Sequence, residues 1–465
     1  KFELFEKYGD VICAVSPGGV TIYVGSVEVA RQMYERRNDF PKATKVYEYV
    51  RFYGDNVLTL EGAEWRRHNK YTRPPFCEAL HKVVWDEGVK QARAAVNVWS
   101  RENSGVRVGR DLRVISMNVL SLSNFGVALP FDCGSETTEH FGQKNIPPGH
   151  KMSYGNAVNN VLDNIIPLAI VPKWLLRNGP ESLRKVGLSY DELGIYLKEL
   201  TQNGERATTP EKENLLGSLV KASAGDGPEK GPGLDDAEVI GNAFIFAVAG
   251  LETTTGTLHY AIMHLALNPD AQDWLHKDLQ EALKDEDQDP SRWEYERVYP
   301  KMASVLCVLH ETLRLNAPHT HIPKWTADKC QPVNWRGREC LLPPGALAYI
   351  TTTALHYNPS LWGDTVKGFN PQRWDLRSSS EGTPVKGAFA PFSDGWRACV
   401  GKNFALVEMA AVLAALFRDC SVRIKRQEGE TQGMADNRGK SAISSSESYL
   451  TVMIRHDVEL EWVRR

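Results

Sequence analysis

Residues 392–401 read Phe-Ser-Asp-Gly-Trp-Arg-Ala-Cys-Val-Gly, and the apolar stretch Ala405–Phe417 follows almost directly. This pattern predicts a glycine-containing loop that places Cys399 at the start of a helix. Unpaired N–H groups and the helix dipole favour a thiolate at such a position, and a thiolate can ligate iron. Gly395 permits a tight turn, and Gly401 lets a flat macrocycle approach the backbone. The alternative is a buried structural cysteine, which is the commonest fate of a lone cysteine.

Two further side chains of this loop suit a ligand that carries iron. Arg397 stands two residues before the cysteine, where its guanidinium can meet a carboxylate on the same ligand. Phe392 can cover the ligand side of the loop and limit the access of water. The loop therefore combines a metal donor, a cation and an apolar cover.

The composition excludes several classes of protein. The chain has 465 residues, 42% of them hydrophobic and 24% charged, and a formal net charge of −3, which excludes the basic footprint of a nucleic-acid binder. Eight scattered cysteines without a CxxC pair argue against a disulfide scaffold and a structural zinc site. No stretch reaches the ~18 unbroken apolar residues of a membrane span, and no signal peptide is recognisable after Lys1.

Most of the chain has helical periodicity. Helices are expected at 260–284, interrupted near Asn268–Pro269, and at 298–315. Strands are expected at 20–24, 348–352 and 422–424, and surface loops at 224–233 and 427–448. We therefore predict a mainly α fold, with small β-sheets at its edge.

A long central helix is predicted from Asp235 to about residue 267, a length of ~50 Å. Its segment 239–251 is apolar apart from Asn242, and Glu252 and Thr253 then interrupt it with polar groups. One interpretation is local: the Thr253 hydroxyl bonds back to the carbonyl of Ala249, while Glu252 reaches solvent. The functional interpretation is that Gly250 and Thr253 loosen the helix and open a groove there.

The loop pattern F-x-x-G-x-R-x-C-x-G resembles the haem-ligand loop of the cytochrome P450 family. Further motifs similar to those of the family occur in the family's order: 65–69 (WRRHN), 249–254 (AGLETT), 311–314 (ETLR) and 369–374 (FNPQRW). The resemblance covers essentially the whole chain and is strongest to eukaryotic microsomal members of fungal type. It implies the cytochrome P450 fold and a single haem domain over residues 1–465.

The resemblance also assigns roles to residues. Haem b would be held through Cys399 as axial ligand of the iron. The other cofactor-binding residues it implies are Trp65, His321, Phe392, Gly395, Arg397 and Gly401. Asn69 stands where relatives usually carry a basic residue, so one expected cation is missing. Glu252 and Thr253 would manage protons beside the oxygen-binding face, and Glu311, Arg314 and Arg373 would form a buried structural charge network. The substrate contacts it implies are Tyr49, Phe52, Phe246, Ala249 and Ala317.

The activity implied is monooxygenation of a lipophilic substrate, such as a secondary metabolite, a steroid or terpenoid, or a fatty acid. One oxygen atom of O₂ enters the substrate, and NADPH supplies electrons through a separate cytochrome P450 reductase, with cytochrome b5 as a further donor. An anchor preceding Lys1 would place the domain on the cytosolic side of the endoplasmic reticulum membrane. Two alternatives stay open: an isomerase or dehydratase of the same fold that needs no reductase, and a non-enzymatic haem carrier or gas sensor. Glu252 and Thr253 argue against the first, and Thr253 and thiolate ligation argue against the second.

Overall fold

The computed structural model describes residues 2–100, 105–131, 146–206, 214–223, 233–377, 385–448 and 450–465. The N-terminal half contains α1 (Glu3–Tyr8), α2 (Val27–Glu35), η1 (Thr44–Val50), α3 (Gly62–Thr72), α4 (Glu78–Trp99), α5 (Val108–Phe125), α6 (Tyr154–Asp163), α7 (Ile165–Ile170), α8 (Lys173–Asn178), α9 (Glu181–Arg206) and α10 (Leu215–Ser223). The C-terminal half contains α11 (Asp236–Leu267), α12 (Pro269–Ala282), η3 (Pro290–Arg292), α13 (Tyr295–Val298), η4 (Tyr299–Lys301), α14 (Ala303–Leu315), α15 (Thr352–His356), α16 (Pro359–Trp362), η5 (Pro371–Trp374), η6 (Gly395–Arg397), α17 (Lys402–Phe417) and α18 (Gln432–Ser444).

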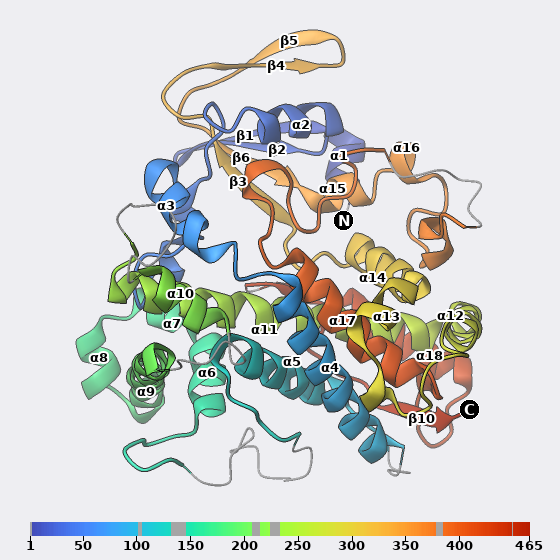
Figure 1. Cartoon of the computed structure of the whole chain (residues 1–465). Helices are drawn as coiled ribbons and strands as arrows, with labels where there is room; N and C mark the ends of the chain where they lie inside the picture. The colour runs from blue at the N-terminus through green and yellow to red at the C-terminus, as the bar shows by residue number, and fades with distance from the viewer. Residues whose placement is uncertain are drawn as a thin grey trace.

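The strands form four small sheets. They are β1 (Val11–Ser16), β2 (Gly19–Val24), β3 (His321–Trp325), β4 (Gln331–Trp335), β5 (Arg338–Leu342), β6 (Leu347–Thr351), β7 (Cys420–Ile424), β8 (Glu447–Ser448), β9 (Val452–Met453) and β10 (Leu460–Arg464). The largest sheet has the order β1-β2-β6-β3, in which only the β2–β6 pair is parallel. Together with α2, it lies above the helical part of the molecule in Figure 1.

Helix α11 runs through the helical part, where it packs on α5, α14 and α17 (Figure 1). Asp235 caps it, because its side chain accepts from the Glu238 N–H while the Glu238 side chain accepts from the Asp235 N–H. Of the described helices, α11 is long and apolar enough to cross a membrane, but 72% of its most apolar window is buried inside the protein. Burial by its neighbours accounts for its composition.

Glycines let the core helices approach closely. A Cβ on Gly88 of α4 would lie 3.1 Å from Ala411 Cβ of α17, and one on Gly250 of α11 would lie 2.7 Å from Leu120 of α5. Gly250 therefore serves the packing of α11 on α5, and the expectation that it opens a groove together with Thr253 stays a prediction. The same core contains Glu408 of α17, which is fully buried. Burial raises the pKa of Glu408 to about 8, against an opposing hydrogen bond from Ser116.

Most predicted elements are confirmed, with two corrections. The strands near 20–24, 348–352 and 422–424 are present, and the helix break falls at Asn268–Pro269. The helix expected at 298–315 begins only at Ala303, because Pro300 within η4 disrupts the preceding turn. Of the two loops expected on the surface, residues 224–232 lie outside the described residues.

The other expected loop contains a helix, α18. Thr431 caps it by accepting from the Met434 N–H. A Cβ on Gly439 would lie 2.9 Å from Ile424 of β7, so a small residue allows α18 to pack on that strand. The polar composition of residues 427–448 concealed this packing face.

Candidate functional site

The loop around Cys399 is tightly folded. Ser393 and Gly395 have positive φ values of 61° and 68°, and a Cβ on Gly395 would lie 3.0 Å from the Tyr34 carbonyl oxygen. The Cys399 N–H donates to the Phe392 carbonyl over 2.9 Å, which closes the turn. The sulfur is consequently held just before the first turn of α17, as the sequence predicts.

The Cys399 side chain is accessible, although the loop and α17 surround it. Burial raises the pKa of its thiol, and the opposing effects of the Gly401 N–H, Lys402 and Lys42 are smaller. The helix start therefore does not by itself maintain a thiolate here, because desolvation outweighs it. A metal ion on the sulfur would deprotonate it.

One face of α11 near its middle is less buried than the rest of the helix. Ala249 is exposed, and Gly250 and Thr253 are half-buried, although Val248, Leu251, Glu252 and Thr254 are buried. The Phe76 ring packs edge-on against Phe246 of α11 at 5.4 Å, and it lies 3.8 Å from where a Gly401 Cβ would be. This ring connects the cysteine loop with α11, the helix that carries Ala249 and Thr253.

The structure supports the local interpretation of the polar pair on α11 for Thr253 but not for Glu252. Thr253 Oγ1 donates to the Ala249 carbonyl over 2.8 Å, as the local interpretation predicts. Glu252 does not reach solvent: it is only 8% exposed, and its Oε2 accepts from Thr451 Oγ1 over 3.4 Å. Burial raises the pKa of Glu252, while Arg113 of α5 lowers it. Arg113 in turn pairs at 3.2 Å with Asp163, whose side chain is 53% exposed.

Glu311, Arg314 and Arg373 come together in one buried ion network. Arg314 donates to both Glu311 oxygens over 2.8 Å, and Arg373 Nε donates to Glu311 Oε1 over 3.1 Å. Burial alone would raise the pKa of Glu311, but the two arginines hold it below its usual value. The other groups bound to the network include the Asn370 N–H, the Trp374 indole, the Thr365 hydroxyl and the carbonyls of His356, Trp362, Thr365, Val366 and Gly368.

Arg397 lies between the cysteine loop and the segment before α3. Its guanidinium stacks on Trp65 at 4.4 Å, pairs with Glu61 at 2.9 Å and donates to the carbonyls of Val57 and Leu60. Its Nε–H is buried and has no hydrogen-bond partner. The arrangement thus leaves one directed donor for a further acceptor.

Comparison with known proteins identifies the chain. The cytochrome P450 family profile matches residues 1–450. The chain belongs to the cytochrome P450 family. It is 29% identical to a cytochrome P450 monooxygenase of Arthrobotrys oligospora, with 100% of this chain and 85% of the relative covered. It is 30% identical to cytochrome P450 monooxygenase 124 of Postia placenta (95% and 83% covered), and 26% identical to the phomenoic acid biosynthesis cluster cytochrome P450 monooxygenase of Leptosphaeria maculans (87% and 74%).

The residues of this P450 fit a haem, the cofactor of the family. The accessible Cys399 sulfur offers an iron ligand, and the unpartnered Nε–H of Arg397 offers a donor to a carboxylate. Positive charge is in excess around Arg397. Burial lowers the pKa of Lys42 well below its usual value and that of Lys324 to about 8, and in both cases Arg397 contributes to the lowering. Glu61 is the carboxylate that opposes this lowering at all three cations, so two acidic groups of a ligand would balance the remaining positive charge.

Sequence reasoning missed both lysines. Lys42 is drawn into the site because its backbone N–H binds the same Glu61 oxygen that Arg397 binds. The sequence contained an indication of Lys324, because it follows Ile322 at the strand period of two and is therefore expected on the same face. In the structure its side chain is 4% exposed. A lysine on the buried side of a strand requires an explanation.

The structure separates other expected residues from this cluster. His321 lies edge-on to Tyr23 and Tyr349, at 5.8 and 5.3 Å, and its Nδ1 bonds to the Thr320 hydroxyl over 2.7 Å. It stands three residues from Lys324 on β3, so the two side chains point to opposite faces.

Of the expected substrate contacts, Ala249 is the one that is exposed. Phe246 is 8% and Ala317 3% exposed, and Tyr49 is partly buried. Phe52 packs edge-on against Phe244 of α11 at 6.2 Å and Tyr190 of α9 at 6.3 Å. Its ring is therefore part of an aromatic packing cluster.

Proposed function

We propose that this P450 inserts one oxygen atom of O₂ into a lipophilic organic substrate, with electrons from NADPH delivered by a separate reductase. The observation that carries the proposal is that Phe76 connects the loop of the accessible Cys399 with α11, on which Ala249 and Thr253 are the less buried positions beside the buried acid Glu252. Residues 1–465 would act as one haem domain, with Cys399 as the axial ligand.

Haem bound through Cys399 would supply the oxygen chemistry, since a thiolate ligand favours O–O cleavage. The contribution of this chain's own residues is the management of protons. Thr253 is only half-buried, and its hydroxyl donates its proton to the Ala249 carbonyl, which leaves the oxygen as an acceptor. Because burial raises the pKa of Glu252, this acid retains a proton to higher pH than an exposed glutamate. Arg113 acts on Glu252 and pairs with the exposed Asp163, so the two residues connect the surroundings of Glu252 with solvent.

The apolar walls between the cysteine loop and α11 favour an apolar substrate. Phe76 and Phe246 form an aromatic pair beside the cysteine loop, and Ala249 adds a small apolar surface. Such walls gain free energy by burying hydrocarbon surface. Secondary metabolism is the proposed context, and similarity to the P450 of the phomenoic acid cluster supports it.

The remaining partners follow from the resemblance to microsomal P450s. We propose NADPH–cytochrome P450 reductase as the electron donor, cytochrome b5 as a further one, and the endoplasmic reticulum membrane as the location, with the domain in the cytosol. Fractionation of cells that express the native gene tests the location. Recovery of the protein in the soluble fraction after disruption of the cells would contradict it.

Reconstitution tests the proposed activity. The haem-loaded protein is combined with reductase, NADPH, O₂ and a library of lipophilic metabolites, and binders are found by displacement of the iron-bound water. We expect NADPH consumption and a product heavier by one oxygen, labelled when ¹⁸O₂ is used. Conversion of a peroxide without reductase would instead identify the isomerase or dehydratase alternative. Reversible O₂ binding without product would identify a carrier or sensor.

A further inference from the structure

Asn242 is a polar residue in the apolar segment of α11, and it is completely buried. Its Oδ1 accepts from the Val57 N–H over 2.9 Å. Its Nδ2 donates to the Glu238 carbonyl over 2.7 Å and faces His68 Nδ1 at 3.0 Å. Both donors and the acceptor of the amide are therefore used.

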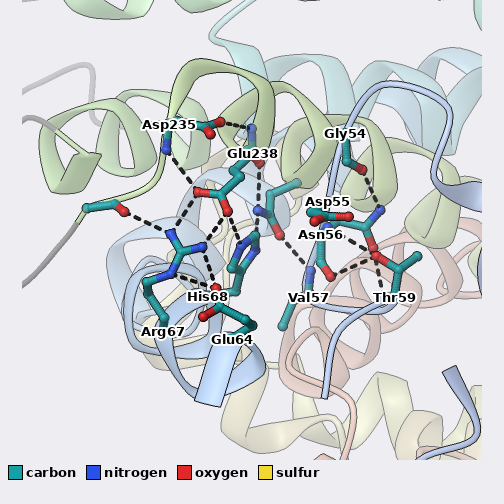
Figure 2. Close-up of polar contacts among 12 residues, drawn as sticks. Gly54, Asp55, Asn56, Val57, Thr59, Glu64, Arg67, His68, Asp235 and Glu238 are labelled. Atoms are coloured by element: carbon teal, nitrogen blue, oxygen red, sulfur yellow. Dashed lines mark hydrogen bonds and ion pairs between the residues drawn. The ribbon is translucent and has the colours of Figure 1, made fainter. Parts of the chain in front are cut away.

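These contacts determine the proton position on His68, whose ring is fully buried. The reverse orientation of the amide would direct Nδ2 at the Val57 N–H and Oδ1 at the Glu238 carbonyl, two repulsive contacts. Nδ2 is thus the donor, and His68 Nδ1 must be the acceptor. His68 Nε2 lies 3.2 Å from Glu238 Oε1 and donates to it. Figure 2 shows His68 and Arg67 of α3 directed at Glu238 of α11.

The segment before α3 lies directly on α11. A Cβ on Gly241 would lie 2.6 Å from the Asp55 carbonyl oxygen, and a Cβ on Gly54 would meet the Ala237 carbonyl. Gly54 also has a φ of +140°, which favours glycine. Two glycines, one on each side, allow backbone-to-backbone contact, and the bond from Val57 to Asn242 closes it.

The same segment holds Arg397. The Val57 carbonyl accepts from Arg397 Nη1 over 3.2 Å, and the Leu60 carbonyl accepts from Nη2. Val57 is thus bound on one side by Asn242 and on the other by Arg397, the cation nearest to Cys399 in the sequence. On α3, His68 lies one turn after Trp65, on which Arg397 stacks. A continuous set of contacts joins α11 to the guanidinium.

We propose that Asn242, oriented by His68, is a positioning residue for haem retention. It fixes segment 54–60 on α11, and that segment directs Arg397 so that its free Nε–H binds an acidic group of haem. The inference rests on the proposed haem-dependent function, but it concerns how firmly the cofactor is held. The competing explanation is that Asn242 and His68 only join α3 to α11.

Haem transfer tests the inference. The haem-loaded protein is mixed with excess apomyoglobin, and the rate of haem loss is followed by absorbance. We expect Asn242→Leu and His68→Leu each to accelerate haem loss about tenfold, because the hydrogen bond from the charged Arg397 Nε–H to the acidic group of haem would be misaligned. Asn242→Ser, which cannot reach Val57, is the second variant should the leucine variants fail to fold.

A matched control separates positioning from general stability. His264, in the last turn of α11, makes a buried bond to Asn316 over 2.7 Å. His264→Leu removes a similar histidine–asparagine bond far along the helix, and we expect less than a twofold change in haem loss. An acceleration equal to that of His68→Leu would overturn the inference.

A double variant tests the route through Arg397. In an Arg397→Ala background, where haem loss is already faster, Asn242→Leu should add less than a factor of two. A further tenfold acceleration would overturn the inference, because Asn242 would then act without Arg397. Haem transfer requires no turnover, so this result is independent of whether the protein oxidises a substrate. A protein that retains haem but forms no product would count against the proposed function alone.

Discussion

Replacing Glu311 with glutamine should destabilise the protein more than any single change of an exposed ion pair. Glu311 and Arg314 are fully buried, and Arg373 is 6% exposed. The substitution keeps the size of the side chain but leaves two buried arginines without a carboxylate. Removing one partner from a buried ion network typically costs ~3–5 kcal/mol. Because two cations are left here, we expect about 5 kcal/mol.

The structure also predicts an order among variants. Arg373→Gln leaves the Glu311–Arg314 pair intact and balanced, so it should cost about 1–3 kcal/mol, the loss of hydrogen bonds alone. The exposed pair Arg423–Glu461 has nearly the same bidentate geometry, at 2.9 and 3.0 Å, with side chains 52% and 42% exposed. Glu461→Gln should therefore cost at most about 1 kcal/mol. Geometry is matched between the two sites, and burial differs.

Urea unfolding of the haem-loaded proteins, followed by far-ultraviolet circular dichroism, measures these costs. The pKa of Glu311 is held below its usual value. The ionised Glu311 therefore stabilises the folded protein at neutral pH, and this stabilisation is lost as the pH falls below the usual value and through the lowered pKa. The difference between parent and Glu311→Gln should thus shrink on acidification. Equal losses from Glu311→Gln and Glu461→Gln at neutral pH would refute the reasoning, and Arg373→Gln remains measurable if Glu311→Gln does not accumulate.

Three further predictions concern chemistry and pH. Thr253→Ala should keep haem and substrate binding but lower product per NADPH by ~10²–10⁴, the range typical of positioned proton transfer, with electrons recovered as hydrogen peroxide. Thr257→Ala removes the same kind of back-bond one turn later, 2.8 Å to the Thr253 carbonyl, and should stay coupled; equal coupling in both variants would contradict the assignment. Cys399→His should abolish the strongly red-shifted absorbance band of the reduced carbon monoxide complex, and its survival would exclude Cys399 as the ligand. Glu408, with a pKa raised to about 8, binds its proton more tightly in the folded than in the unfolded chain. The free energy of unfolding should therefore fall by up to about 4 kcal/mol as the pH rises from 5 to 8. Glu408→Gln should flatten this decline in urea titrations, and an unchanged decline would show that another group causes it.

The sequence by itself determined the features that depend on neighbours along the chain. The loop before α17 places Cys399 through residues only a few positions away. Glu311 meets Arg314 because residues three positions apart on a helix lie on the same face. The back-bond of Thr253 to Ala249 follows from the same helical period. Hydrogen bonds and turns of this kind are specified within one or two turns of backbone, so a pattern in the sequence suffices to predict them.

Only the tertiary structure decided what surrounds these groups. Val57 and Asn242 are 185 residues apart, and Arg397 and Val57 are 340 apart, yet each pair shares a hydrogen bond. Glu252 is buried rather than solvated because Thr451, from the far end of the chain, covers it. Lys42 and Arg397 likewise come from distant parts of the sequence and both bind Glu61. Burial and charge balance depend on segments brought together from the whole chain, so the spacing of residues within one segment cannot predict them.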